Sequence, residues 1–164
     1  MKHEKAVLAA GCFWGVEELF RTYKGVLSTE VGYCGGDADE ANYNIVKTGV
    51  TEHAEAILVE FDSEQLSYRD LLRAFFKLHD PTTKNQQGND VGRQYRSAIF
   101  YYNDEQKIAA EEIKAEVQKS GKWTRPIVTE ISAVAGAEFY SAEDYHQDYL
   151  QKNPDGYMCH FWRD

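Results

Sequence analysis

The residues of this chain best suited to covalent chemistry are its three cysteines, Cys12, Cys34 and Cys159. An odd number of cysteines cannot pair completely, and a chain of 164 residues is large enough to fold without a disulfide framework. The sequence has no Cys-x-x-Cys and no Cys/His spacing typical of a zinc site. Chemistry at a thiol and inert packing of the cysteines are therefore the two interpretations.

Cys12 is predicted to begin a helix directly after a strand. Residues 5–10 are predicted to form a short buried strand, and the residues after Cys12 have helical apolar spacing at Val16, Leu19, Phe20 and Tyr23. Unpaired N–H groups and the positive dipole at a helix N-terminus favour a thiolate over a thiol. Cys12 is therefore a candidate nucleophile, and a buried cysteine at a strand–helix junction is the alternative.

The neighbours of Cys12 suggest how a substrate could reach its sulfur. Gly11 and Gly15 lack side chains, so we expect them to let the backbone approach a substrate closely. Phe13 and Trp14 would supply an apolar wall beside the sulfur, unless both rings belong to the hydrophobic core.

Glu55 is a candidate general acid because of its place in a predicted strand over residues 55–61. It shares one face of that strand with three apolar residues, Ile57, Val59 and Phe61. A carboxyl group on an apolar face is costly to ionise, which raises its pKa and keeps it protonated near neutral pH. The alternative is a glutamate at the strand end that tilts into solvent.

Further helices and strands must position these side chains. Gly25 is predicted to end the first helix, Ser67 to cap a second that stops at Asp80-Pro81, and Asn103 to cap a third that runs to residue 120. Strands are predicted over residues 97–102 and 127–134, and an irregular segment from residue 136 onward. This spacing alone does not separate a parallel sheet from a two-layer α+β sandwich.

Composition and charge exclude several classes of function. The net charge of −9 argues against a nucleic-acid partner, and no apolar run approaches the roughly 20 residues that a membrane helix needs. Residues 6–10 are too short for a signal peptide, and Glu4 stands where such a peptide carries positive charge. We therefore expect a cytoplasmic protein with no membrane association, built as a single domain over residues 1–164.

Several motifs resemble the A-class peptide methionine sulfoxide reductases. The most specific is Gly-Cys-Phe-Trp-Gly at residues 11–15. Further blocks resemble that family in the same order, at residues 32–36, 53–55, 79–83, 87–97, 142–147 and 152–157. Since the resemblance spans nearly the whole chain, it favours chemistry at Cys12 over inert packing.

This resemblance implies a fold and a reaction. The fold is α+β, a two-layer sandwich with a ferredoxin-like core and a long irregular C-terminal segment. The reaction is the reduction of methionine-(S)-sulfoxide, free or in proteins, to methionine. Cys12 would attack the sulfoxide, Glu55 would protonate its oxygen, and Tyr43, Asp90 and Tyr95 would surround that oxygen. The resulting sulfenic acid would become a disulfide that thioredoxin reduces, and no metal, flavin or nicotinamide is expected.

Two thiols could resolve the sulfenic acid. Cys159 follows Gly156-Tyr157, as the resolving cysteine of the family often does, and we expect its segment near the C-terminus to be mobile. Cys34 stands where the family commonly carries another small residue, so it is expected to pack in a tight turn or to act as a relay. We therefore predict that Cys159 resolves.

Two other functions compete with this interpretation. One is a cysteine hydrolase that pairs Cys12 with His53 or His146, and the other is a redox-sensing binding module with a Cys12–Cys159 disulfide and no turnover. We predict no catalytic role for His53, His79 or His146, because each more simply satisfies local hydrogen bonds.

Overall fold

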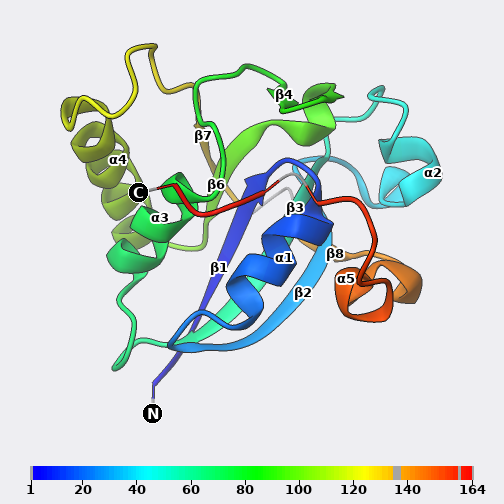
Figure 1. The fold of residues 1–164 in the computed structure, drawn as a ribbon, viewed down its shortest axis with the longest axis horizontal. Helices are drawn as coiled ribbons and strands as arrows, with labels where there is room; N and C mark the ends of the chain where they lie inside the picture. Colours follow the sequence, from blue (N-terminus) through cyan, green and yellow to red (C-terminus); the bar gives the residue numbers. More distant parts are fainter. Residues whose placement is uncertain (1, 135–137, 159, 164) are drawn as a thin grey trace.

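The computed structural model describes residues 2–134, 138–158 and 160–163. Among these residues the main feature is a six-stranded sheet in the order β7-β6-β1-β3-β2-β8 (Figure 1). Its strands are β1 (His3–Ala10), β2 (Val26–Cys34), β3 (Ala54–Asp62), β6 (Ser97–Tyr101), β7 (Glu130–Ala133) and β8 (Tyr140–Ser141). The neighbours β1 and β3 are antiparallel, whereas β6 and β7 are parallel. This mixed sheet with helices confirms the expected α+β fold.

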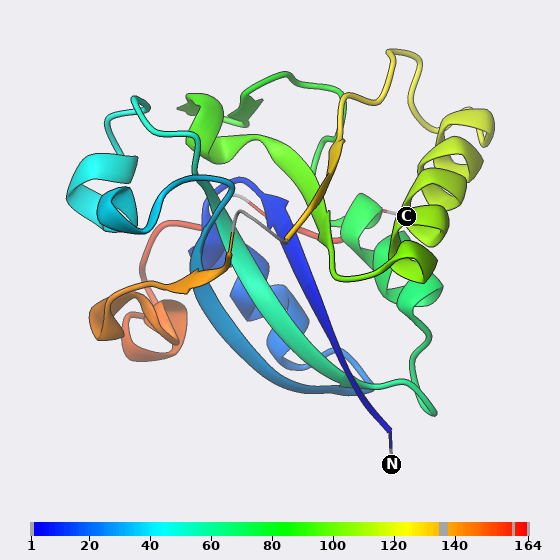
Figure 2. The same ribbon diagram turned by 180° about the vertical axis from the view of Figure 1, so that it is seen from behind.

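In the described part of the chain, three helices cover one face of the sheet, and Figure 2 shows from behind that none of its helices crosses the middle of the other face. They are α1 (Phe13–Arg21), α3 (Tyr68–Lys77) and α4 (Asp104–Lys119). Two short helices, α2 (Tyr43–Val46) and α5 (Tyr149–Lys152), lie toward the β2–β8 edge, and a small hairpin joins β4 (Gln86–Gln87) to β5 (Asp90–Val91). The larger hydrophobic core lies between the sheet and α1, α3 and α4.

Strand alternation divides the buried side chains between the two faces. Leu8, Ile57 and Phe61 pack with α1, α3 and α4 on the helical face. The second core holds smaller side chains on the opposite face, namely Val7, Ala9, Cys34, Ala54, Ala56, Ala98, Phe100 and Val134. Each helix therefore needs an apolar stripe on one side only, which is the pattern found in the sequence.

The two helix N-caps predicted from the sequence are confirmed. The Ser67 side chain accepts from the Asp70 N–H at 3.0 Å, and the Asn103 side chain accepts from the Gln106 N–H at 2.9 Å. The prediction for Gly25 is wrong, because α1 ends at Arg21 with Thr22 as its C-cap. Gly25 has a φ of 98° and lies in the turn between α1 and β2, where the Val26 N–H donates to the Tyr23 carbonyl. Each capped helix starts within a residue of its signal, so local chemistry sets these boundaries.

The largest error of the sequence analysis is the omission of β2. Its first half is exposed or half-buried and contains Ser28 and Glu30, so no apolar alternation marks it. Cys34 is the last residue of this strand, and the expected tight turn at Cys34 is wrong. The last predicted strand is also shorter than residues 127–134, because only residues 130–133 pair with β6.

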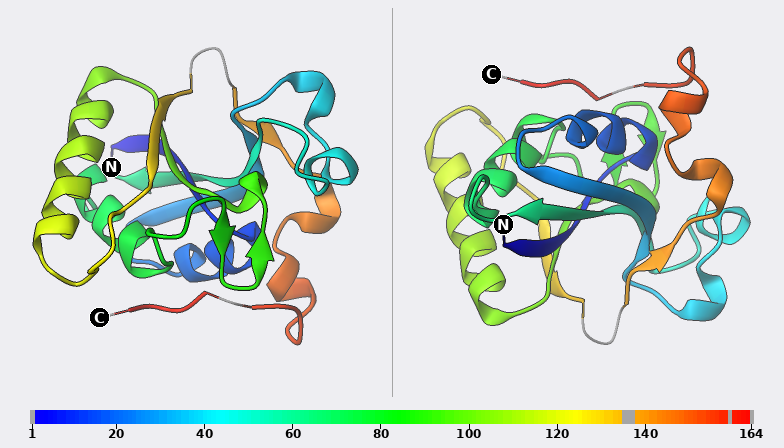
Figure 3. Two further views of the ribbon diagram at one scale, coloured as in Figure 1. Left: turned by 90° about the horizontal axis from the view of Figure 1, so that it is seen from above. Right: turned by 90° about the horizontal axis from the view of Figure 1, so that it is seen from below.

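The C-terminal segment crosses the helical face, from α5 past the start of α1 to α3 (Figure 3). The Arg163 N–H donates to the Lys77 carbonyl at 2.7 Å at the end of α3. The described residues 160–163 are thus bound to the domain, and Cys159, for whose segment mobility was expected, lies outside the described residues. No helix in the described part of the chain has both the length and the apolar composition needed to cross a membrane.

Candidate active site

Cys12 stands at the turn between β1 and α1, as predicted. It is the N-cap residue of α1 and is 8% exposed. The next N–H, that of Phe13, donates to Glu55 Oε1 at 3.2 Å. This bond joins the first turn of α1 to β3, so the candidate nucleophile and the candidate acid are held by neighbouring central elements.

A small cavity of about 80 Å³ opens beside Cys12. Its lining residues are Cys12, Phe13, Trp14, Tyr43, Glu55, Asp90, Tyr95 and Tyr157. The structure therefore brings together every site residue predicted from the sequence except Cys159, which lies outside the described residues. Tyr157 was not singled out by the sequence analysis, although it falls in one of the motifs quoted there.

Glu55 is buried, with 2% of its surface exposed. Burial raises the pKa of its carboxyl group from 4.5 to about 8, and the hydrogen bond from the Phe13 N–H offsets part of that rise. The predicted apolar face is the cause, since Ile57 and Val59 follow Glu55 on the same side of β3. A proton donor at neutral pH is therefore available at the floor of the cavity.

Two tyrosines and an aspartate complete the polar side of the cavity. Burial, followed by the nearby Glu55, raises the pKa of Tyr43 and of Tyr95, so both phenols remain hydrogen-bond donors. Burial also raises the pKa of Asp90, whose Oδ2 accepts from the Tyr157 hydroxyl at 3.2 Å. Tyr43 of α2, Glu55 of β3 and Tyr95 of the segment before β6 thus all offer a hydrogen-bond donor to the same cavity.

Aromatic rings form the apolar side of the cavity and are held from behind. Trp14 stacks on Tyr149 with ring centroids 3.8 Å apart, and its indole N–H donates to His146 Nδ1 at 3.0 Å. His146 also lies against Phe13, at 5.2 Å between centroids. Burial lowers the pKa of His146, which keeps Nδ1 available as an acceptor. His146 therefore orients Trp14. Neither strand parity nor the spacing of residues in the sequence predicted this role.

Glu143 fixes the opposite wall from outside the cavity. Its carboxylate accepts from the Tyr33 hydroxyl at 2.8 Å and from the Tyr43 N–H at 3.0 Å. The first turn of α2, which carries Tyr43, is thereby tied to β2. Glu143 falls in one of the motifs quoted above, but its role was not predicted, because its partners lie at least 100 positions away.

The expectation for the two glycines that flank Cys12 is wrong. A side chain at Gly11 would lie 2.7 Å from Gln87 Cβ, and one at Gly15 would collide with the imidazole of His160. Gly11 also has a φ of 95°, which disfavours any side chain. Both glycines make room for side chains of this protein, not for a substrate.

The two fully buried histidines named in the sequence analysis are engaged by local hydrogen bonds. His53 accepts from the Gly36 N–H at 3.2 Å and donates to the Asp37 carbonyl at 2.7 Å. His79 donates to the Phe75 carbonyl and accepts from the Ser97 hydroxyl, both at 2.8 Å. Neither ring lines the cavity beside Cys12, so the structure gives His53 no place in a Cys–His pair.

Cys34 lies on the other face of the sheet from Glu55. It pairs with Ala54 in the β2–β3 register, whereas Glu55 pairs with Tyr33, and successive residues of a strand point to opposite faces. Burial raises the pKa of the Cys34 thiol to about 12. Cys34 therefore sits among apolar side chains of the second core, away from the cavity that Cys12 lines.

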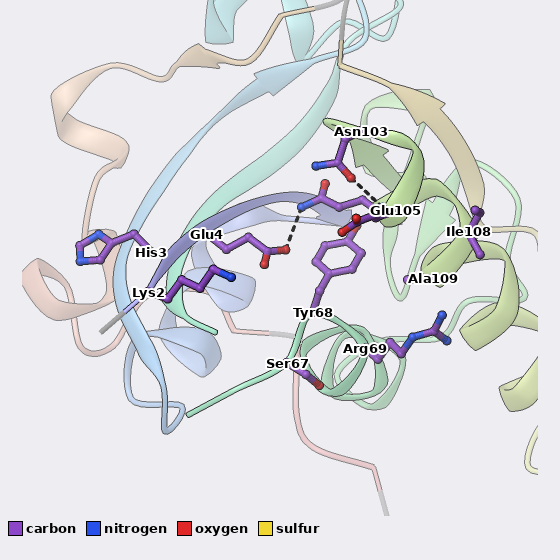
Figure 4. Close-up of a pocket in the computed structure, with 11 residues that line it drawn as sticks. Lys2, His3, Glu4, Ser67, Tyr68, Arg69, Asn103, Glu105, Ile108 and Ala109 are labelled. Atoms are coloured by element: carbon purple, nitrogen blue, oxygen red, sulfur yellow. Dashed lines mark hydrogen bonds between the residues drawn. The ribbon is translucent and has the colours of Figure 1, made fainter. Parts of the chain in front are cut away.

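A larger hollow of about 670 Å³ lies between the start of β1 and the N-terminal ends of α3 and α4 (Figure 4). Its walls carry charges of both signs, from Lys2, Arg69, Glu4 and Glu105. The Gln106 amide donates to the Glu4 carboxylate at 3.3 Å across it. Its lining, among the residues that the structure describes, contains no cysteine, whereas Cys12 lines the smaller cavity.

Comparison with known proteins agrees with this geometry. The family model for peptide methionine sulfoxide reductase matches residues 4–163. Peptide methionine sulfoxide reductase MsrA 1 of Mesorhizobium japonicum is 58% identical over 160 residues, which cover 98% of this chain and 90% of the relative.

Two solved structures of Mxr1 from Saccharomyces cerevisiae also resemble the chain. The reduced form superimposes with a TM-score of 0.92 at 39% identity, covering 99% of this chain and 93% of that one. The form in complex with Trx2 gives a TM-score of 0.67 at 28% identity, covering 99% and 91%.

Proposed function

Because the chain belongs to the peptide methionine sulfoxide reductase family, we propose that Cys12 is the nucleophile with which it reduces methionine sulfoxide to methionine. The observation that carries the assignment is the pairing of Cys12 with a buried acid whose pKa is raised to about 8. A sulfoxide needs both groups, because its sulfur is attacked while its oxygen takes up a proton.

The two sides of the cavity suit the two ends of a methyl sulfoxide. Phe13 and Trp14 offer apolar surface to the methyl group, and the hydroxyls of Tyr43 and Tyr95 can donate hydrogen bonds to the oxygen. Asp90, bonded to Tyr157 at 3.2 Å, is assigned to the polar rim of the same site. The methionine side chain would thus be held with its sulfur toward Cys12.

The first chemical step transfers the oxygen. The Cys12 thiolate attacks the substrate sulfur, Glu55 gives its proton to the oxygen, and methionine leaves while Cys12 becomes a sulfenic acid. The substrate sulfur is reduced by two electrons and the Cys12 sulfur is oxidised by two. Glu55 recovers its proton from solvent before the next turnover.

The second step regenerates a reducible form of the protein. We assign Cys159 as the resolving thiol, which condenses with the sulfenic acid to a disulfide and releases water. Thioredoxin then reduces the disulfide, an assignment supported by the complex of the related Mxr1 with Trx2. Dependence on thioredoxin also supports a cytoplasmic location, because that compartment is reducing.

The substrate is methionine-(S)-sulfoxide, free or within a protein. The epimer follows from family membership, and the half-exposed Tyr157 at the rim supports access for a methionine that is part of a longer chain. Separate assays with the S and R epimers test this choice, and equal rates for both would overturn it.

Single-turnover assays without reductant test the roles of the two cysteines. Cys12→Ser is expected to release no methionine, since a hydroxyl is neither soft nor ionised at neutral pH. Cys159→Ser is expected to release one equivalent at the normal rate and then to stop, even with thioredoxin present. Methionine release by Cys12→Ser, or continued thioredoxin-driven turnover by Cys159→Ser, would refute the respective role.

A further inference from the structure

The imidazole of His160 packs against the turn that carries Cys12. It is 4% exposed, and its Nε2 lies 2.6 Å from the carbonyl oxygen of Ala10, two residues before Cys12. On either side of Cys12 the ring is bounded by a glycine. A side chain at Gly11 would lie 3.4 Å from Nε2, and one at Gly15 would collide with Nδ1. The two glycines thus form a seat for this ring.

The neutral form of His160 suits its buried position beside the Ala10 carbonyl. Burial lowers the pKa of its imidazole to about 4, so the ring is neutral at physiological pH. Since a carbonyl oxygen can only accept, the proton resides on Nε2 and is donated to Ala10. A neutral, hydrogen-bonded ring can stay buried without the cost of a buried charge.

Further contacts after His160 keep the segment in place. The Trp162 ring packs edge-on against Phe20 of α1, with centroids 6.2 Å apart. The Arg163 N–H donates to the Lys77 carbonyl, and the Arg163 carbonyl accepts from the Lys122 ammonium, each at 2.7 Å. Of these contacts, the one between His160 and Ala10 lies nearest in sequence to both cysteines. Ala10 is two residues before Cys12, and His160 directly follows Cys159.

We propose that His160 is a positioning residue for the resolving step: by docking on Ala10 between Gly11 and Gly15, it holds the C-terminal segment where Cys159 can reach the sulfenic acid of Cys12. The proposal rests on the assignment of Cys159 as the resolving thiol. Consecutive Cα atoms are about 3.8 Å apart, so a contact that fixes one residue restricts its neighbours in the chain.

The step in question is the condensation of two sulfur groups. The Cys12–SOH and the Cys159–SH become one disulfide and one water, with no external oxidant. The rate of such a step depends on how often the two groups meet in disulfide geometry. His160 takes no part in the bond changes, so its loss should slow this step and leave the earlier release of methionine unchanged.

The test follows two rates in a single turnover without reductant. In His160→Ala, methionine release is expected within about twofold of wild type, while disulfide formation slows by about ten- to a hundredfold, as for a misplaced reacting group. The sulfenic acid then persists and can be trapped by dimedone and measured by mass spectrometry. His160→Gln retains an N–H donor and should recover much of the rate of disulfide formation.

Gly15→Ala tests the seat from the other side. The new methyl group would displace the imidazole, so this variant should reproduce the defect of His160→Ala. Because both changes break one contact, the double variant should be no slower than the slower single variant. Ile113→Val, a buried change in α4 away from the seat, controls for a general loss of stability.

The outcomes separate this inference from the proposed function. Normal disulfide formation in His160→Ala, or equal slowing of methionine release, overturns the positioning role. Additive defects in the double variant, or an equal defect in Ile113→Val, overturn it as well. If instead Cys159→Ser keeps thioredoxin-driven turnover, the assignment of the resolving thiol fails first.

Discussion

Replacement of Glu55 by glutamine tests the acid role most directly. With a pKa of about 8, about nine in ten Glu55 side chains are protonated at pH 7, against about three in a thousand at a pKa of 4.5. Burial therefore increases the supply of acid at neutral pH about 300-fold. Glu55→Gln keeps the shape but cannot release a proton, so methionine release should slow by about 10²–10⁴.

The pH profile of single-turnover methionine release distinguishes acid catalysis from simple binding. In the wild type the rate should fall about tenfold per pH unit above pH 8, as Glu55 ionises. The glutamine variant should lack this fall, and circular dichroism at each pH confirms that both proteins remain folded. A wild-type rate that stays level from pH 8 to 10, or a variant near the wild-type rate at pH 7, would refute the reasoning.

Two further predictions concern stability and the third cysteine. The folded pKa of Glu55, about 8, exceeds its unfolded value near 4.5, so its contribution to stability is complete below pH 4.5 and is lost as pH rises through 8. The free energy of unfolding from urea titrations should therefore fall by up to about 1.4 kcal/mol per pH unit between pH 5 and 8, relative to Glu55→Gln; parallel curves would contradict this. Cys34→Ala should keep thioredoxin-driven turnover within about twofold, because Cys34 faces the second core. Loss of turnover with methionine release intact would make Cys34 the resolving residue.

The fold could be predicted where local chemistry decides it. The caps at Ser67 and Asn103, the strand at residues 55–61 and the turn at Cys12 all have short-range signals, and the structure confirms them. The strand β2 had no such signal, because its exposed half is polar and its stability comes from pairing with β3. Pairing between distant segments does not follow from periodicity.

The candidate site divides in a similar way. Strand parity predicted the burial of Glu55, and the motifs indicated the other residues that line the cavity. The roles of Glu143, His146 and His160, which hold the site in shape, could not be inferred, because their partners lie at least 100 positions away. For Gly11 and Gly15 the sequence suggested close approach of a substrate, because nothing local showed that the side chains of Gln87 and His160 pack against them.

The contact between Ala10 and His160 spans 150 positions, which orders events during synthesis. At about 5–20 residues per second, His160 is added roughly 8–30 s after Ala10. Throughout that interval the nascent chain carries Cys12 without the imidazole that later fills the turn beside it. The mature form of the turn that carries Cys12 is therefore among the last parts of the molecule to be built.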